Sequence, residues 1–498
     1  MATRWPRRIA WTLGLLLLAA LLAAGNALPL HAADPSADAL PDPGPARKVD
    51  IPVAQDRTLP NGMRVVVVNR AVTPLVSVAL YLRSGAEADP PRLAGLTDLT
   101  AGLLDKGTKT RTAPQIAEAA DALGGSLGTG ASFDASQAAI TVTTPKLDAA
   151  LALLADVVRN PTFADAEIER ERKRMLDGLR LALSQPGSVA GFVAARSIYG
   201  DGAYGHPAGG TPASLPRIKR ADVVKLHATY YRPDNAVLVF AGDIDLERAV
   251  QAATQAFGDW KAPPTPLPKA PAGIGKSSVA SAVAVDVPGT GQAAVTVLHA
   301  GIARNAPDFY AGIVANAVLG GSYSARLNQE IRIKRGLSYG ARSSLDLRRQ
   351  GGAFAGSAQT KNPSAADVVA LMLGEFAQLR DTPVGADELA ARKATLSGSF
   401  GFALETTRGL LGQIADLAVS GLPLDELSHY LDKVQAVGGD QVRAFAAAHL
   451  GADGLRIVVA GDAAQFAPAL AKAYPKLERL DAAALDLDSP SLKPAKAK

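Results

Sequence analysis

The chain has 498 residues, of which 48% are hydrophobic and 20% are charged, so it is long enough for roughly two to four domains with their own cores. This composition excludes a disordered or collagen-like chain. The absence of cysteine excludes disulfides, a thiolate nucleophile, a cysteine-based zinc site and a lipid-anchored signal. The net charge is +5 for the whole chain. Without the first 32 residues, 49 basic and 47 acidic residues remain, a net charge of +2, so we expect no nucleic-acid partner.

The N-terminus carries the pattern of an export signal. Arg4, Arg7 and Arg8 precede an apolar run over residues 9–24, and residues 30–32 form a small-residue cleavage site. We therefore predict a signal peptide over 1–32, a flexible tether over 33–48, and an exported, periplasmic protein. The apolar run is long for a signal, so the alternative is an uncleaved N-terminal membrane anchor.

A proline-rich stretch divides the remaining chain almost equally. Five prolines between residues 261 and 277 exclude regular structure and predict an extended linker. The expected domains are therefore residues 49–260 and 278–478, followed by a tail over 479–498.

The two halves resemble each other, with landmarks in the same order. A strand leads to Gly85 in the first half and to Gly301, 216 positions later, in the second. Each half also closes with a strand that ends in Ala-Gly-Asp, at 241–243 and again 219 positions later at 460–462. Matched landmarks of this kind predict two tandem copies of one unit.

Within each unit the predicted strands and helices come in runs. Residues 139–144 favour a strand, whereas 147–159 and 164–183 have the apolar spacing of helices. Runs of one type are typical of an α+β domain with a mixed or antiparallel sheet and helices on one face. A doubly wound parallel sheet would need strict alternation instead.

The segment 95–108 begins with Gly-Leu and ends with Lys-Gly-Thr. It resembles the signature of the pitrilysin/insulinase-type zinc peptidases, in which these residues frame an H-x-x-E-H helix. In that motif two histidines at i and i+4 chelate zinc from one helix face, and the Glu between them activates the bound water.

None of the residues that this chain has at those positions can do that chemistry. The two histidines of the motif fall on Asp98 and Gly102, and its Glu falls on Ala101. The third ligand, about 76 residues beyond the second His in the family, falls on Gly178. Because catalytic zinc needs three protein ligands, we expect no metal in this chain. We read Asp98 as a helix-surface carboxylate, and Gly178 as a sign that the empty site has collapsed around it.

A second family signature is kept in the other half. The segment 320–340 resembles the one in which the family carries an Arg and a Tyr seven residues apart, here Arg332 and Tyr339. We expect Ser324 to cap a short helix and Gly336 to end it, so that the turn brings Tyr339 back towards Arg332. The resemblance implies that this pair binds substrate by donating hydrogen bonds to the scissile carbonyl. Considered one at a time, the two residues would be interpreted as an ion-paired arginine on a helix and a half-buried tyrosine on a strand.

A weaker resemblance concerns residues 125–133, a glycine-rich stretch before the strand at 139. In the family an edge strand near this position pairs with an extended substrate. An ordinary edge strand and turn explains the stretch equally well.

The resemblance covers nearly all of residues 49–477 and implies a clam-like chamber that two such chains enclose. It predicts a non-catalytic subunit that binds peptides, while an H-x-x-E-H partner of the same family supplies zinc and the general base. No peptidase activity is expected of the chain alone. The alternative is a structural or peptide-binding protein of the same fold without a role in proteolysis, in which the Arg/Tyr pair would be a relic.

Overall fold

The computed structural model describes residues 51–494. The predicted signal peptide, the tether and the start of the first predicted domain therefore lie outside the described residues. No helix between Ile51 and Pro494 is both long and apolar enough to cross a membrane.

The first half of the chain forms a six-stranded mixed sheet. Its strands, in the order in which they lie side by side, are β1 (Ala54–Thr58), β2 (Arg64–Asn69), β6 (Ala236–Gly242), β3 (Leu75–Leu82), β5 (Ser136–Thr143) and β4 (Gly128–Ala131). Only β2 and β6 run parallel, and every other neighbouring pair is antiparallel. Strand β6 is buried along its whole length, which explains its unbroken apolar sequence.

The second half repeats this sheet. Its strands lie in the order β12 (Glu478–Asp481), β7 (Ala282–Asp286), β11 (Arg456–Gly461), β8 (Gln292–Ala300), β10 (Ala353–Lys361) and β9 (Ser338–Leu345). Strands β8 and β11 take the places that β3 and β6 hold in the first sheet, and β9 takes the edge place of β4. The predicted α+β fold of two homologous domains is confirmed.

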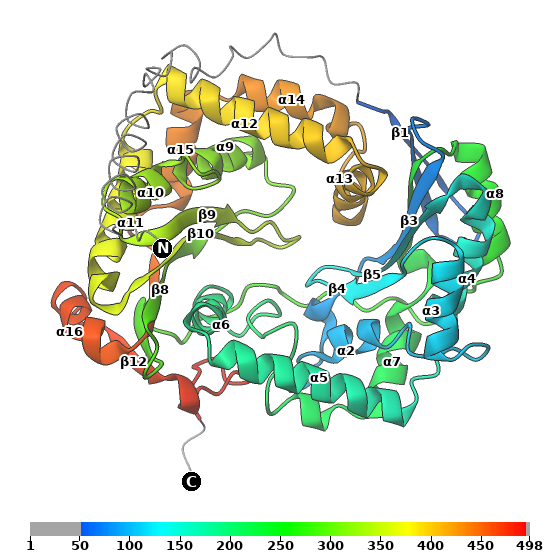
Figure 1. Ribbon diagram of the computed structural model, residues 1–498, viewed down its shortest axis with the longest axis horizontal. Coiled ribbons are helices and arrows are strands. Elements are labelled where there is room, and N and C mark those ends of the chain that lie inside the picture. Colours follow the sequence, from blue (N-terminus) through cyan, green and yellow to red (C-terminus); the bar gives the residue numbers. More distant parts are fainter. Residues whose placement is uncertain (1–50, 495–498) are drawn as a thin grey trace, which may run out of the picture. The chain divides into compact units, whose positions relative to one another are not determined.

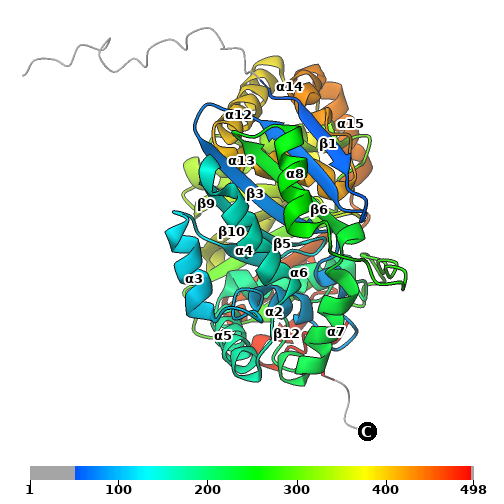
Figure 2. The ribbon, with the colours of Figure 1, turned by 90° about the vertical axis from the view of Figure 1, so that its right-hand side faces the viewer.

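Helices follow the strands in a similar order in both halves, and among the described residues the second half has one α-helix more. Those of the first half are α2 (Leu96–Gly102), α3 (Ala113–Ala122), α4 (Leu147–Arg159), α5 (Asp165–Leu183), α6 (Pro186–Tyr199), α7 (Arg220–Tyr230) and α8 (Leu246–Phe257). Those of the second are α9 (Phe309–Leu319), α10 (Arg326–Asn328), α11 (Ala365–Asp381), α12 (Ala386–Leu404), α13 (Thr407–Ser420), α14 (Glu426–Ala436), α15 (Gly439–His449) and α16 (Ala463–Ala473). Figure 2 shows α4 and α8 lying over the first sheet.

Each sheet is covered on its other face by a helix from the opposite half. Helix α6 packs on β8 and β11, and α13 packs on β3 and β6 (Figure 1). Val189 and Val193 of α6 are fully buried in a core that they share with the second sheet. The hydroxyls of Ser77 on β3 and Thr407 on α13 share a hydrogen bond of 2.8 Å. The sequence prediction of helices on one face described each unit alone and missed this exchange.

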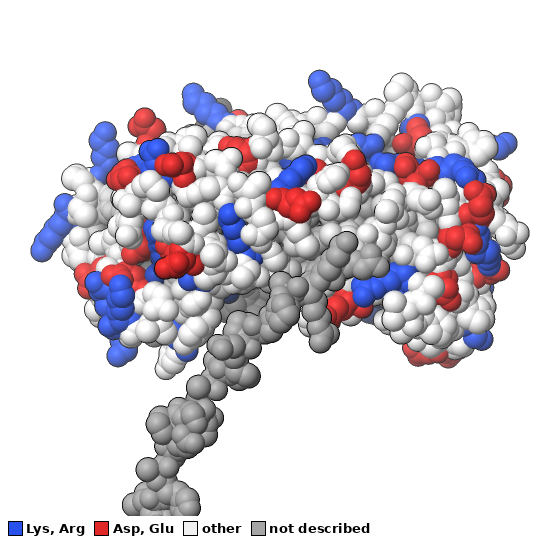
Figure 3. Space-filling model, turned by 90° about the horizontal axis from the view of Figure 1, so that it is seen from above, with Lys and Arg blue, Asp and Glu red and all other residues white. Residues whose placement is uncertain are grey.

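The proline-rich stretch 261–277 contains no helix or strand. It is nevertheless held to the loop after α6, because Tyr204 donates its backbone N–H to Gly273 and Gly275 donates to Tyr199, both over 2.9 Å. Acidic and basic side chains alternate over the face drawn in Figure 3, and neither sign dominates there.

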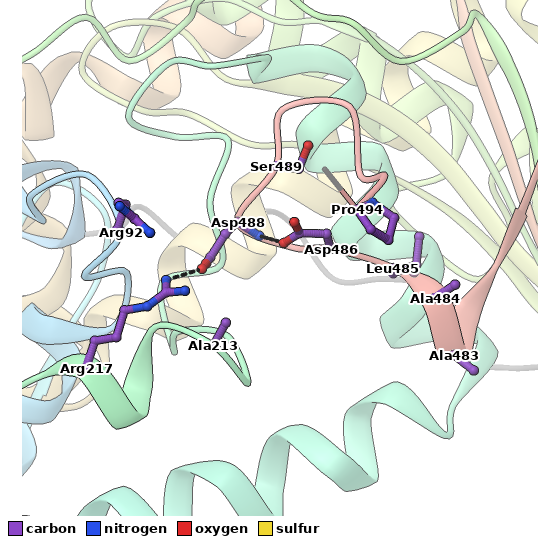
Figure 4. A pocket seen from close by; sticks show the side chains of 10 residues that line it. All are labelled: Arg92, Ala213, Arg217, Ala483, Ala484, Leu485, Asp486, Asp488, Ser489 and Pro494. Carbon is purple, nitrogen blue, oxygen red and sulfur yellow. Dashed lines mark hydrogen bonds and ion pairs between the residues drawn. The ribbon is translucent and has the colours of Figure 1, made fainter. Parts of the chain in front are cut away.

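The C-terminal segment is more ordered than the predicted tail. Strand β12 begins at Glu478, and Leu487 and Leu492 are buried beyond it in the core that contains α6. Figure 4 shows Asp488 beside Arg217, whose guanidinium donates to it over 2.9 Å at a cavity of about 540 Å³. The expected boundary at residue 478 is therefore too early, because the apolar leucines in this segment find a core to enter.

Candidate functional site

The segment that carries Arg332 and Tyr339 reverses direction between them. Helix α10 continues into a π-helical turn over Gln329–Ile333, which contains Arg332. Gly336 has a φ of +62°, the left-handed conformation that was expected at the end of the helix. Leu337 then donates its N–H to the carbonyl of Ile331 over 2.9 Å, and β9 begins at the next residue.

Both members of the predicted pair line one cavity of about 1070 Å³. Arg332 is half-buried, and its guanidinium carbon lies 4.9 Å from the centre of the Tyr323 ring, within cation–π range. Tyr339 is 87% exposed, so its hydroxyl is open to a ligand. The cavity extends over the face of β8, β9 and β10 and reaches Gly187 and Gly191 of α6.

A buried arginine holds the loop that carries Tyr323. Arg392 of α12 is 8% exposed and donates to the hydroxyls of Ser322 and Ser324 over 2.9 and 2.7 Å. The predicted helix cap at Ser324 is therefore wrong. Ala325 occupies the cap position, because the Ser324 hydroxyl is taken by a guanidinium that must find acceptors away from water.

Asn328 fixes the same loop to β9. Its side-chain amide donates to the carbonyl of Tyr323 over 2.6 Å and accepts from the N–H of Ala341 over 3.1 Å. Sequence reasoning missed both Arg392 and Asn328. Only their polarity at buried helical positions could have indicated them.

The positions of the lost zinc motif lie on α2, away from this cavity. Asp98 is half-buried rather than on the helix surface, and Ala101 is fully buried. Burial raises the pKa of Asp98, the nearby negative charge of Glu171 raises it further, and Arg174 opposes both. The carboxylate that we expected on the surface is thus part of a charge cluster in which Glu171 is buried, Asp98 is half-buried and Arg174 is exposed.

Glu171 of α5 occupies the space beside Gly102. A Cβ atom added at Gly102 would lie 2.8 Å from its Oε1, and Arg174 donates from Nε to its Oε2 over 2.9 Å. Sequence reasoning did not single out Glu171. It lies between the buried Ile168 and Met175 at helical spacing, which was the available signal for an inward-facing carboxylate.

Gly178 lies more than one helical turn beyond Glu171, at an exposed position of α5. A Cβ atom added there would meet nothing within 4 Å, so the close packing that we expected around it is wrong. Residues 51–494 contain no group of three or more His, Cys, Asp or Glu side chains that could hold a metal ion. The side chains at the motif positions do not fit a catalytic zinc, because Asp98 alone offers one carboxylate.

Two family models match this chain in adjoining regions. Residues 64–190 match the insulinase family, peptidase family M16, and residues 217–396 match the peptidase M16 inactive domain. The fold, the tandem sheets and these matches define a peptidase-type protein. The chain belongs to the insulinase-type M16 family.

Relatives of the same family cover most of the chain. An uncharacterised zinc protease of Streptomyces coelicolor is 28% identical over 79% of this chain and 86% of its own length. An uncharacterised zinc protease of Bacillus subtilis is 25% identical over 76% of this chain and 91% of its own. The crystal structure of a peptidase M16 inactive domain from Pseudomonas fluorescens is 28% identical, with a TM-score of 0.76 over 82% of this chain and 98% of its own.

A protease from Helicobacter pylori has the same fold, with a TM-score of 0.78 at 21% identity over 82% of this chain and all of its own.

Proposed function

We propose that the chain is the non-catalytic subunit of a heterodimeric zinc peptidase of this family. In this proposal it binds peptide substrates, and a partner chain with an H-x-x-E-H helix supplies zinc and the general base. The observation that carries the proposal is the placement of Arg332 and Tyr339 on one open cavity, while α2 has none of the motif's side chains.

The chemistry of the two side chains supports this role. A guanidinium and a phenol are both hydrogen-bond donors, and together they can hold the carbonyl oxygen of a peptide on which negative charge develops. The contact of Arg332 with the Tyr323 ring favours one direction of the guanidinium before a ligand arrives. The side chain of Tyr339 is 87% exposed, so a ligand can reach its hydroxyl without any rearrangement of the protein.

The proposed location is outside the cytoplasm, in the periplasm, because residues 1–32 have the pattern of an export signal. A protein without cysteine needs no oxidative folding there, since packing alone holds both cores together.

The test is reconstitution of peptidase activity. The purified chain is mixed with an H-x-x-E-H protein of the same family from the same organism, and cleavage of a quenched fluorescent peptide is followed for each protein alone and for the mixture. Cleavage that requires both chains, and that falls about 100-fold in Arg332→Ala or Tyr339→Phe, supports the proposal. Unchanged cleavage in both variants refutes it and leaves a structural or peptide-binding protein. Stoichiometric zinc in the isolated chain would also contradict it.

A further inference from the structure

The cavity that holds Arg332 and Tyr339 is positively charged. It is lined by two arginines, Arg332 and Arg342, and by no Asp, Glu, Lys or His. Neither guanidinium forms an ion pair or a side-chain hydrogen bond with any of residues 51–494, although most arginines of this chain have a carboxylate partner within reach, as Arg326 has Glu388. Two unpaired cations in one groove attract an anionic ligand.

The register of the second sheet places Arg342 on the floor of this groove. Ala341 and Ser343 of β9 are buried, so Arg342 between them points to the opposite face and is exposed. It pairs with Ser357 of β10, and Ser357 pairs with Thr296 of β8. All three residues line the groove, so Arg342 lies in a row with two hydroxyl groups and no carboxylate.

The rest of the lining favours an extended chain over a compact ligand. Gly187 and Gly191 of α6 bring no side chain into the groove, and a Cβ atom added at Gly191 would meet nothing within 4 Å, so a ligand backbone has room there. Two exposed tyrosines, Tyr323 at 62% and Tyr339 at 87%, also line the groove and offer apolar contact and hydroxyl groups. The groove's volume of about 1070 Å³ fits several residues of a peptide.

The edge of β9 limits how such a peptide can bind. The N–H of Ser343 donates to the carbonyl of Gly320 over 3.1 Å, and the N–H of Ala341 donates to Asn328 over 3.1 Å. These two backbone donors are already used, so pairing of a ligand strand along this part of β9 is blocked. Recognition in the groove then depends on side chains, above all on the charge of the two arginines.

We propose that this groove selects peptides that carry carboxylates, with Arg342 as a residue that determines specificity. Arg342 binds an acidic group of the ligand while Arg332 and Tyr339 hold the neighbouring backbone carbonyl. The inference rests on the proposed function for the identity of the ligand as a peptide, but the charge preference is measurable on the isolated chain.

The experiment measures binding to the purified chain without a partner. The probes are three short fluorescent peptides, acetylated and amidated, that differ only in carrying Glu, Gln or Lys at the same three positions. Because a hydrogen bond to a charged group is stronger than one to a neutral group, we expect the Glu peptide to bind about tenfold tighter than the Gln peptide. The Lys peptide should bind most weakly, and added salt should reduce the difference between the three.

Arg342→Gln is the test variant and Arg443→Gln is its matched control. Arg443 lies on α15 outside the groove; its side chain is partly exposed and is paired with Asp440 over 3.5 Å. We expect Arg342→Gln to weaken binding of the Glu peptide about fivefold and to leave the Gln peptide nearly unchanged. Equal binding of the Glu and Gln peptides overturns the proposal. Equal weakening of Glu-peptide binding by Arg342→Gln and Arg443→Gln also overturns it, because that result would mean long-range electrostatic attraction without a binding site.

A further arm separates the two sources of a peptide carboxylate. The Gln peptide with a free C-terminus binds as tightly as the amidated Glu peptide if the groove holds a terminal carboxylate, and as weakly as the amidated Gln peptide if it holds side chains. Both results keep the carboxylate as the ligand. If the Glu preference is found but no partner restores cleavage, the proposed function fails and the selectivity stands. If a partner restores cleavage but the Glu peptide is not preferred, the charge selectivity fails and the proposed function stands.

Discussion

Protonation of Glu87 is expected to change the stability of the fold between pH 5 and pH 8. Its side chain is 2% exposed, and Oε2 accepts the N–H of Gly85 over 2.8 Å. Burial raises its pKa from 4.5 to about 7, although the charge of Arg349, 3.6 Å away in the second half of the chain, works against the rise. Between pH 4.5 and about pH 7, Glu87 therefore carries a proton in the folded state and has lost it in the unfolded state.

The sign and size follow from that difference. Because the folded state holds more protons between pH 4.5 and pH 7, the free energy of unfolding falls as pH rises through this window. A shift from 4.5 to about 7 corresponds to roughly 3 kcal/mol in full, of which about 2.5 kcal/mol is lost between pH 5 and pH 8. Glu87→Gln cannot titrate, so its stability relative to the parent should rise by about that amount over the same interval.

Urea unfolding of both proteins at pH 5 and pH 8 measures the effect. The exposed Glu118→Gln on α3 serves as control for the removal of one negative charge. If the difference in free energy of unfolding between Glu87→Gln and the parent is the same at pH 5 and pH 8, the prediction is wrong. That result would mean that Glu87 is ionised in the folded protein at both pH values.

Three further substitutions test the packing. Gly178→Ala should raise the free energy of unfolding by about 1 kcal/mol, because alanine is a better helix former and nothing lies within 4 Å of the new methyl group. A lower free energy of unfolding in urea would mean that a neighbouring group does contact this position. Ile414→Ala, at a fully buried position of α13, should cost about 2 to 5 kcal/mol, and a loss below 1 kcal/mol would contradict tight packing around α13. Leu487→Ala should cost a similar amount, about 2 to 5 kcal/mol, if the C-terminal segment belongs to the core, whereas a freely exposed tail would show no change in the same assay.

The sequence predicted the repeated unit and its elements because their signals are local. Helix α4 begins and ends at the expected residues, since its apolar positions recur every three to four residues over 147–159. Gly336 was placed correctly because a left-handed residue at the end of a helix is nearly always glycine. The resemblance to the family singled out Arg332 and Tyr339, and both residues line one cavity, while their role in substrate binding stays a prediction.

Contacts between distant segments were beyond the same reasoning. The exchange of α6 and α13 between the sheets depends on pairings such as Ser77 with Thr407, which no local pattern encodes. The cap predicted at Ser324 failed because Arg392, far along the chain, competes for the hydroxyl. The burial of Glu171 beside Gly102 likewise arises from the packing of α5 on α2.

Arg332 and Tyr339 are proposed to act on a peptide that a partner's zinc site cleaves. The most direct measurement is the turnover of a quenched peptide by the reconstituted pair, with Tyr339→Phe in this chain and Tyr474→Phe, a partly buried tyrosine after α16, as control. We expect no cleavage by this chain alone, cleavage by the mixture, and a loss in kcat of about 100-fold for Tyr339→Phe only. Equal turnover by the parent and Tyr339→Phe, or full cleavage by the partner without this chain, would contradict the proposal.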